Sequence, residues 1–191
     1  LELIAKSHDE LGNFKESYHF FEKNNDLSKK IDKNSADKEV FLETINKRIK
    51  YFNSLNVKEW ETEKNDNDSK DPIFLIGFPR SGTTLLDSIL RSHNLIEVLE
   101  EKPLVENFIK ELESRINNDF SKLENISESF FYEMRDIYFD ERSKYIKGNS
   151  DKIYIDKLPL NIVHVAEIFS FFPNAKFIFA LRNPYDVVLS C

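Results

Sequence analysis

One stretch of the chain decides the fold: Ile73-Phe74-Leu75-Ile76-Gly77-Phe78-Pro79-Arg80-Ser81-Gly82-Thr83-Thr84. Its first four residues form a continuous apolar run, which is typical of a buried parallel strand. Helical spacing of apolar residues follows over 84–92. A glycine-containing turn between a strand and a helix directs backbone N–H groups at a single anion, and hydroxyl groups add further donors. The stretch therefore predicts a phosphate-binding loop inside an α/β domain.

The cation in this loop separates two kinds of chemistry. Gly77 and Gly82 have the spacing of a nucleoside-triphosphate loop, but Thr83 occupies the position of the expected lysine, and the cation is Arg80. Nucleoside triphosphatases use that lysine with magnesium to neutralise the β- and γ-phosphates. A donor with one 5′-phosphate carrying a sulfuryl group has less charge to neutralise. The structural alternative is a turn that enters a helix and binds nothing.

The chain after this loop alternates between short apolar runs and helical patterns. The runs predict strands at 96–99, 153–155 and 177–181, and the patterns predict helices at 104–116, about 127–146 and 162–172. Strands separated by helices indicate a parallel, three-layer α/β sheet with right-handed crossovers.

Charged residues follow each of the predicted strands. Because the carboxyl ends of parallel strands meet at one edge, where ligands of open α/β folds bind, Arg80, Glu101, Lys157 and Arg182 are expected to gather there. Three cations and one carboxylate suit an anionic donor and a hydroxyl acceptor. Asp156 is a candidate partner for Lys157.

Residues 1–60 are predicted to form a helical region, with Gly12-Asn13 separating the first two helices. The stretch 11–23 resembles the turn and second helix of a tetratricopeptide repeat, which buries its apolar face by stacking on neighbours. A plain helical hairpin is the alternative. The apolar positions expected on the packed faces of these two helices are Leu3, Ile4, Leu11, Phe14, Tyr18 and Phe21.

A third helix, from about residue 37 to 55, is expected to pack on the following domain. Its apolar side would carry Val40, Phe41, Ile45, Ile49 and Phe52. Residues 61–71 contain no apolar member and are interpreted as a solvated linker, which leaves 72–191 as the α/β domain.

Composition limits the function classes. The 191 residues include 27 basic and 34 acidic side chains, for a net charge of -7. This balance argues against a broad nucleic-acid surface but permits a local anion pocket. The single cysteine, Cys191, excludes an internal disulfide framework and fits a reducing compartment, so we expect a cytoplasmic protein. The sequence shows no signal pattern, no apolar stretch long enough to span a membrane and no metal-ligand cluster.

The loop Pro79-Arg80-Ser81-Gly82-Thr83-Thr84 resembles that of the P-loop sulfotransferases, whose 5′-phosphosulfate loop reads Pro-Arg-Ser-Gly-Thr-Thr. The resemblance is to the branch with bacterial tetratricopeptide-repeat sulfotransferases and the tyrosyl-protein sulfotransferases. It implies that 3′-phosphoadenosine-5′-phosphosulfate is the co-substrate, and that Arg80, Ser81, Gly82, Thr83 and Thr84 hold its 5′-phosphate and sulfate. The stretch 181–190 is similar to the family's 3′-phosphate motif, which implies that Arg182 and Ser190 bind that phosphate.

The resemblance also implies catalytic roles. Glu101 lies at the distance from Arg80 that the tyrosyl-protein enzymes keep between loop arginine and general base. Glu100 remains the alternative, because the neighbouring sequence departs from the family's usual Gly-Glu-Glu. Lys157 matches a family lysine implied to stabilise the leaving bridging oxygen. We interpret His93 as a helix C-terminal cap. Helical spacing places three aromatic residues in the core: Phe169, Phe171 and Phe172.

The expected reaction is transfer of a sulfuryl group to a hydroxyl or phenol, on a peptide tyrosine, a carbohydrate or a small molecule, without a metal. The helical region would offer a surface for a protein partner. We expect the domain to continue past Cys191, because adenine contacts and acceptor-pocket residues follow in the family. Two alternatives remain open, a P-loop kinase or nucleoside triphosphatase and a non-catalytic interaction module.

Overall fold

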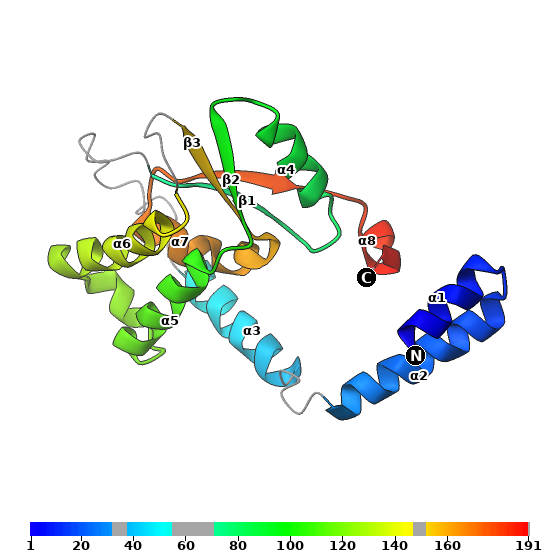
Figure 1. The fold of residues 1–191 in the computed structure, drawn as a ribbon. Helices are drawn as coiled ribbons and strands as arrows, with labels where there is room; N and C mark the ends of the chain where they lie inside the picture. Colours follow the sequence, from blue (N-terminus) through cyan, green and yellow to red (C-terminus); the bar gives the residue numbers. More distant parts are fainter. Residues whose placement is uncertain (32–37, 55–70, 147–151, 191) are drawn as a thin grey trace. The chain divides into compact units, whose positions relative to one another are not determined.

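The computed structural model describes residues 1–31, 38–54, 71–146 and 152–190 (Figure 1). The chain divides into two compact units, Leu1–Asn46 and Lys47–Cys191. Residues 61–70 of the predicted linker lie outside the described residues. Among the helices that the structure describes, none has the length and apolar character needed to cross a membrane.

The second unit is built on a parallel sheet of four strands in the order β2-β3-β1-β4. The register pairs Leu75 of β1 and Glu100 of β2 with Lys157 of β3, and Gly77 of β1 with Ala180 of β4. The strands therefore end at one edge, which confirms the predicted α/β fold. Their bounds are β1 Ile73–Gly77, β2 Ile96–Glu100, β3 Ile153–Lys157 and β4 Lys176–Ala180.

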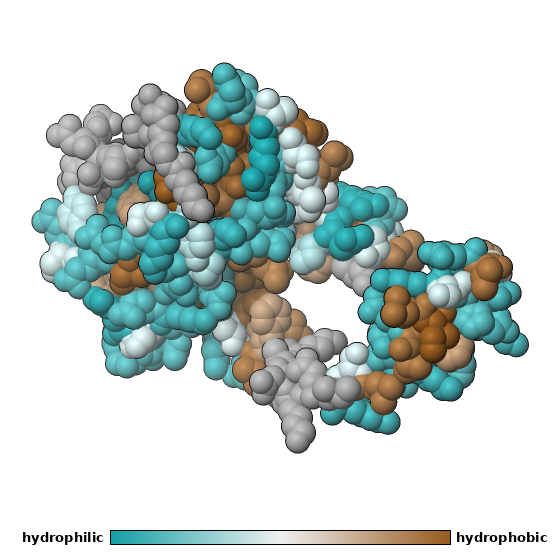
Figure 2. Space-filling model, viewed as in Figure 1, coloured by the Kyte–Doolittle hydropathy of each residue, from teal (hydrophilic) through white to brown (hydrophobic). Residues whose placement is uncertain are grey.

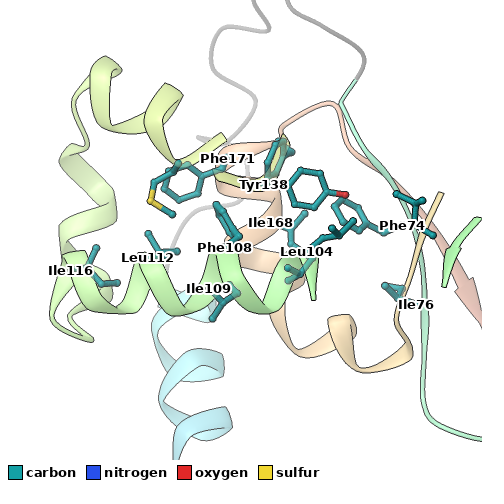
Figure 3. Close-up of a cluster of buried hydrophobic side chains, with 14 residues drawn as sticks. Phe74, Ile76, Leu104, Phe108, Ile109, Leu112, Ile116, Tyr138, Ile168 and Phe171 are labelled. Carbon is teal, nitrogen blue, oxygen red and sulfur yellow. The ribbon is translucent and has the colours of Figure 1, made fainter. Parts of the chain in front are cut away.

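One face of the sheet carries the larger hydrophobic core (Figure 3). Phe74, Ile76 and Leu99 project from the strands into a cluster with side chains of three helices, α5 (Leu104–Ile116), α6 (Glu128–Ser143) and α7 (Val165–Phe171). Phe171 and Phe172 are fully buried there, as interpreted from their spacing, and Phe169 is half-buried.

The opposite face packs on α4 (Thr83–Arg91). Leu75, Val98 and Ile155 alternate with the residues of the first face and form a second cluster with Leu86 and Leu90 of α4. Successive side chains of a strand point to opposite faces, so this alternation fixes which polar residues at the strand ends face α4.

Short 3₁₀ segments and one further helix complete this unit. The predicted helix 162–172 is instead divided into η3 (Pro159–His164) and α7, because the chain starts helically at Pro159 in the tighter 3₁₀ form that is common at helix starts. The segment η2 (Phe120–Asn125) follows α5, and α8 (Pro184–Ser190) follows β4.

In the first unit, α1 (Glu2–Glu10) and α2 (Phe14–Ile31) form a hairpin through Gly12, whose φ of 75° suits glycine. The predicted packing faces are wrong in detail. The buried residues are the small Ala5 and Ser17, which allow close approach of the two helices. Large apolar side chains of this hairpin remain exposed instead: Leu3, Ile4, Leu11, Phe14 and Tyr18. Figure 2 shows hydrophobic surface over the hairpin.

The helix α3 (Lys38–Ser54) also differs from its predicted apolar face, since Val40, Phe41 and Ile49 are exposed. Arg48 is buried instead. Its Nε donates to Glu167 Oε1 at 2.7 Å and its Nη2 donates to Glu113. The last turns of the helix add stacking of Tyr51 and Phe52 on Phe120: ring centroids lie 5.9 Å apart in each pair.

Asp71, the last residue of the predicted solvated linker, is not solvated. Its side chain is only 4% exposed, and Oδ1 accepts from Arg135 Nη2 at 2.8 Å. Oδ2 accepts from the backbone N–H of Asn174. The guanidinium of Arg135 also lies 5.0 Å from the ring centroid of Phe172. This buried ion pair holds the chain two residues before β1 against the helical layer.

Candidate functional site

The loop between β1 and α4 folds tightly against β4. A Cβ atom at Gly77 would lie 2.7 Å from Ser81 Oγ and 2.9 Å from the carbonyl oxygen of Ala180, so only glycine fits. Gly82 has a φ of 95° and Arg80 a φ of 69°, both in the left-handed region. The Ser81 N–H donates to the Phe78 carbonyl at 3.0 Å, which closes the turn. Two left-handed residues within three positions curl the backbone into a concave loop.

This loop ends at a helix start that lacks a side-chain cap. The N-cap residue of α4 is Gly82, which has no side chain to accept a hydrogen bond from the helix. N–H groups of the first turn are therefore available to a ligand. Ser81 Oγ is buried and has no hydrogen-bond partner among the residues that the structure describes, while Thr83 is 4% exposed. A buried, unsatisfied hydroxyl beside an uncapped, positively polarised helix terminus fits an oxyanion ligand.

Changing Gly77 to Ala tests the tightness of this loop. The added Cβ would overlap Ser81 Oγ and the Ala180 carbonyl, and we expect loss of loop geometry with destabilisation of roughly 1–3 kcal/mol. Urea unfolding and anion binding measure the two effects. Gly12→Ala is the control for anion binding: a Cβ at Gly12 meets no atom within 4 Å, although its φ of 75° makes alanine cost about 1–2 kcal/mol there. Unchanged anion binding in Gly77→Ala would contradict the assigned role of the loop.

The two predicted nucleotide motifs lie side by side. Arg182 Nη1 donates to the carbonyl oxygen of Arg80 at 3.0 Å. Arg80 Nε in turn donates to the carbonyl oxygen of Ser190 at 2.9 Å and lies 3.4 Å from Ser190 Oγ. Residues about a hundred positions apart are thus joined at the carboxyl ends of the adjacent strands β1 and β4. Both guanidinium groups are exposed, which leaves further N–H donors for a ligand.

The other two candidate residues meet across β2 and β3. Lys157 Nζ donates to Glu100 Oε1 at 2.9 Å and to Glu101 Oε1 at 3.2 Å. The lysine side chain is 1% exposed, whereas the side chains of Glu100 and Glu101 are 46% and 61% exposed. The backbone N–H of Glu101 donates to the Lys157 carbonyl at 2.8 Å, and the residue has a φ of 50°. A buried ammonium therefore faces two accessible carboxylates.

These contacts set the charge states of the cluster. The Lys157 ammonium, hydrogen-bonded to Glu100, lowers the pKa of that carboxyl. Burial disfavours the charged lysine, but its hydrogen bonds to Glu100 and Glu101 outweigh burial and raise the pKa of Lys157. The lysine is thus held as a cation at neutral pH.

The sequence did not identify two residues next to this cluster. One is Arg91, in the last turn of α4. Its Nη2 lies 3.5 Å from Glu100 Oε2, and its guanidinium donates to both carboxylate oxygens of Asp87. Asp87 is itself buried. The signal was present as an acidic residue four positions before an arginine on a helix, a spacing that predicts an ion pair.

Asp156 does not pair with Lys157, so that interpretation is wrong. Successive residues of β3 point to opposite faces, and Asp156 enters the larger core, where the Tyr138 hydroxyl donates to Oδ2 at 3.2 Å. Oδ1 has no hydrogen-bond partner. Burial raises the pKa of Asp156 to about 7, and its bond to Tyr138 offsets part of the increase.

His93 follows the C-cap residue of α4, Ser92, and its Nδ1 accepts from the Leu95 N–H at 3.2 Å. The side chain therefore stabilises the turn into β2. Within the described ranges no group of three or more His, Cys, Asp or Glu residues is arranged to hold a metal ion.

Comparison with known proteins decides the family. The model of the sulfotransferase family matches residues 72–191, well over half of the chain. The chain belongs to the sulfotransferase family. Its matched segment begins just before β1 and includes the loop, Glu101, Lys157 and the Arg182 motif.

Two proteins similar to this chain are longer than it. An uncharacterized protein of Aquifex aeolicus (strain VF5) is 34% identical over an alignment of 133 residues that covers 64% of this chain and 17% of the relative. The crystal structure of sulfotransferase STF9 from Mycobacterium avium matches 77% of this chain and 49% of its own, with 16% identity and a TM-score of 0.39. The chain therefore spans about a sixth of the first protein and about half of the second.

Proposed function

We propose that this chain contains the donor-binding part of a sulfotransferase that uses 3′-phosphoadenosine-5′-phosphosulfate and transfers its sulfuryl group to a hydroxyl or phenol. One observation carries the proposal, the hydrogen-bonded contact between the Arg80 loop and the Arg182–Ser190 segment. A nucleotide phosphorylated at both its 5′ and 3′ positions needs two anion sites next to each other, and this contact supplies them.

The loop serves as the site for the 5′-phosphate and sulfate. Backbone N–H groups at the start of α4 and the unsatisfied Ser81 hydroxyl provide neutral donors, while Arg80 provides charge. Thr83 and Thr84 add hydroxyl groups at the first helical turn. Thr83 stands where a nucleoside-triphosphate loop has lysine, so the loop carries less positive charge than a triphosphate requires.

The second segment serves as the site for the 3′-phosphate. Arg182 lies two residues after the end of β4 and has further guanidinium N–H groups beyond the one bound to the Arg80 carbonyl. Ser190 is near the end of α8, and its hydroxyl lies 3.3 Å from the Val187 carbonyl, to which it donates. A planar guanidinium and a hydroxyl together suit the oxygens of a phosphate monoester.

The residues of the Lys157 cluster supply the chemistry. A carboxylate of the Glu100–Glu101 pair takes the acceptor hydroxyl proton as the new oxygen–sulfur bond forms. The bond between sulfur and the bridging phosphate oxygen breaks, and its electron pair remains on adenosine 3′,5′-bisphosphate. Lys157 donates a hydrogen bond to that oxygen and stabilises its developing charge. The burial of Lys157 strengthens this interaction, because water does not screen it.

The acceptor is a hydroxyl group of a peptide tyrosine, a carbohydrate or a small molecule. The exposed apolar side chains of the α1–α2 hairpin, such as Leu11 and Phe14, support a role for the first unit in binding a protein partner. Both proposals concern the whole protein rather than the donor site.

Calorimetry with adenosine 3′,5′-bisphosphate on the full-length protein tests the donor site. We expect binding by the wild type and at least tenfold weaker binding by Arg80→Ala and by Arg182→Ala, since each loses a charge-assisted contact. Arg115→Ala is the matched control, because this arginine lies on α5, roughly 17 Å along the helix from its start, and pairs with Glu111 of α5 and Glu133 of α6.

The two alternative hypotheses, a P-loop kinase or nucleoside triphosphatase and a non-catalytic interaction module, predict different results in the same experiment. A P-loop kinase or nucleoside triphosphatase would bind ATP with magnesium but not adenosine 3′,5′-bisphosphate. Its unfolding temperature would rise with ATP and magnesium and stay unchanged with the bisphosphate. An interaction module would respond to neither nucleotide. Either result would overturn the proposed donor.

A further inference from the structure

The Lys157 cluster contains two carboxylates on one ammonium, and only one of them is needed to take the acceptor proton. Their environments differ. Glu100 closes β2, faces α4 and is shared between Lys157 Nζ at 2.9 Å and Arg91 Nη2 at 3.5 Å. Glu101 has its described ion pair with Lys157 alone, at the longer distance of 3.2 Å, and its side chain is the more exposed.

Arg91 is a fixed group rather than a mobile surface arginine. Its Nε and Nη2 donate to the two oxygens of Asp87, the latter at 3.3 Å, and Asp87 is 3% exposed. A fork of two hydrogen bonds to a buried carboxylate restricts the orientation of the guanidinium. The remaining contact of Arg91 is directed at Glu100, so α4 presents a held cation to one carboxylate of the pair.

We propose that Glu100 is a positioning residue that stays on Lys157, held by Arg91 on its Asp87 anchor, while Glu101 leaves the lysine and accepts the acceptor proton. This inference rests on the proposed sulfotransfer and assigns separate roles to the two carboxylates. Glu100 between two cations is a weak base, because Lys157 lowers its pKa.

The backbone at Glu101 supports this division. Its N–H bond to the Lys157 carbonyl and its left-handed φ of 50° fix the main chain beside the lysine. The side chain, 61% exposed, remains free to change rotamer. When the donor's bridging oxygen takes a hydrogen bond from Lys157, Glu101 gives up its own bond to the lysine, and its carboxylate becomes available. Glu100 continues to orient the ammonium.

Kinetics of the full-length enzyme test these roles through the pH profile of kcat. We expect Glu101→Gln to lose the ascending limb of the profile, which reports the base. Glu100→Gln should keep that limb and lower kcat three- to tenfold. Arg91→Gln should act in the same direction as Glu100→Gln, and the double variant should be no slower than Glu100→Gln alone. Arg115→Gln, which also loses an i,i−4 ion pair on a helix, should match the wild type.

Two kinetic outcomes overturn the proposal. One is loss of the ascending limb in Glu100→Gln with its retention in Glu101→Gln. The other is multiplication of the Arg91→Gln and Glu100→Gln effects in the double variant, which would show that the two residues act separately.

Carboxyl titration by NMR, with ¹³C-labelled glutamate, gives a readout that needs no activity. The charged groups around Glu100 are Lys157, Arg91 and Lys102. Arg91→Gln should raise the titration midpoint of Glu100; an unmoved Glu100 midpoint overturns the proposed clamp. If the midpoint rises but the wild type transfers no sulfuryl group, the clamp stands and the proposed function fails.

Discussion

Replacing Lys157 with methionine is expected to lower kcat for sulfuryl transfer by about 10²- to 10³-fold, while binding of adenosine 3′,5′-bisphosphate weakens by a smaller factor. The ammonium lies at the end of β3 with its side chain almost fully buried, and methionine fills a similar volume without charge. Lys157 donates most strongly to the bridging oxygen as charge develops there in the transition state. The same oxygen stays on the bisphosphate product, whose 5′-phosphate the Arg80 loop also binds. Single-turnover transfer and calorimetry separate the two effects.

Lys152→Met is the matched control for this prediction. Lys152 precedes the same strand, and its Nζ lies 2.9 Å from Glu97 Oε2 of β2, so it makes an equivalent cross-strand ion pair at the opposite end of the sheet. Exposed pairs of this kind contribute about 0–1 kcal/mol, and we expect unchanged catalysis. Equal losses in both variants would assign the effect to sheet stability, and an unchanged kcat in Lys157→Met would contradict the role of the lysine.

The sheet was predictable because its strands carry a signal that does not depend on distant residues. The apolar run at 73–76 and the run at 96–99 appear as β1 and β2, each extended by one residue to Gly77 and Glu100. Buried parallel strands must be apolar on both faces, so the pattern survives without knowledge of their partners. The helix 104–116 has the predicted bounds for a similar reason, since its apolar stripe is continuous.

The N-terminal helices were predicted as elements, but their packed faces were not. Spacing identifies an apolar stripe without saying what covers it, and in the α1–α2 hairpin the close contact is made by Ala5 and Ser17. In α3 a buried arginine, Arg48, replaces the expected apolar contacts because Glu167 and Glu113 supply two carboxylates. Buried ion pairs link residues far apart in sequence and leave no periodic pattern.

The sequence predicted candidate site residues that follow a strand and match a motif. It did not predict residues that only the packing of the folded chain brings to the site. Arg80 and Arg182 were expected to be neighbours from their positions after two strands, and the structure joins them. Arg91 could not be assigned to the cluster, because its contact with Glu100 depends on how α4 lies against β2. The predicted pairing of Asp156 with Lys157 was wrong because neighbouring strand residues face opposite sides, and Tyr138 as its partner required the packing of α6.

Replacing Asp156 with asparagine is expected to remove one contribution to the pH dependence of the protein's free energy of unfolding. The carboxyl is buried, and its folded-state pKa of about 7 exceeds the ordinary value of 3.8. Below pH 3.8 both states hold the proton, so the residue adds no pH dependence. Between pH 3.8 and 7 the unfolded chain releases the proton and the folded chain keeps it, so stability falls as pH rises. The total is roughly 4 kcal/mol at 1.36 kcal/mol per pH unit.

Asparagine cannot ionise, so the Asp156→Asn protein should gain stability over the wild type as pH rises from 4 to 8, by up to about 4 kcal/mol. At pH 4 the two should be similar, apart from about 1–3 kcal/mol for an amide N–H left unpaired beside Tyr138. Urea unfolding at several pH values measures the difference, which cancels the titration of every other carboxyl group.

Asp140→Asn is the control, because Asp140 is an exposed residue of the same helix as Tyr138. The difference in free energy of unfolding between Asp140→Asn and the wild type should be the same at every pH. If the difference in free energy of unfolding between Asp156→Asn and the wild type is also the same at every pH, the buried carboxyl has an ordinary pKa in the folded protein. Water or a charge must then reach it. That result would show that the core behind Lys157 is open, which would also weaken the argument that burial strengthens the lysine's charge.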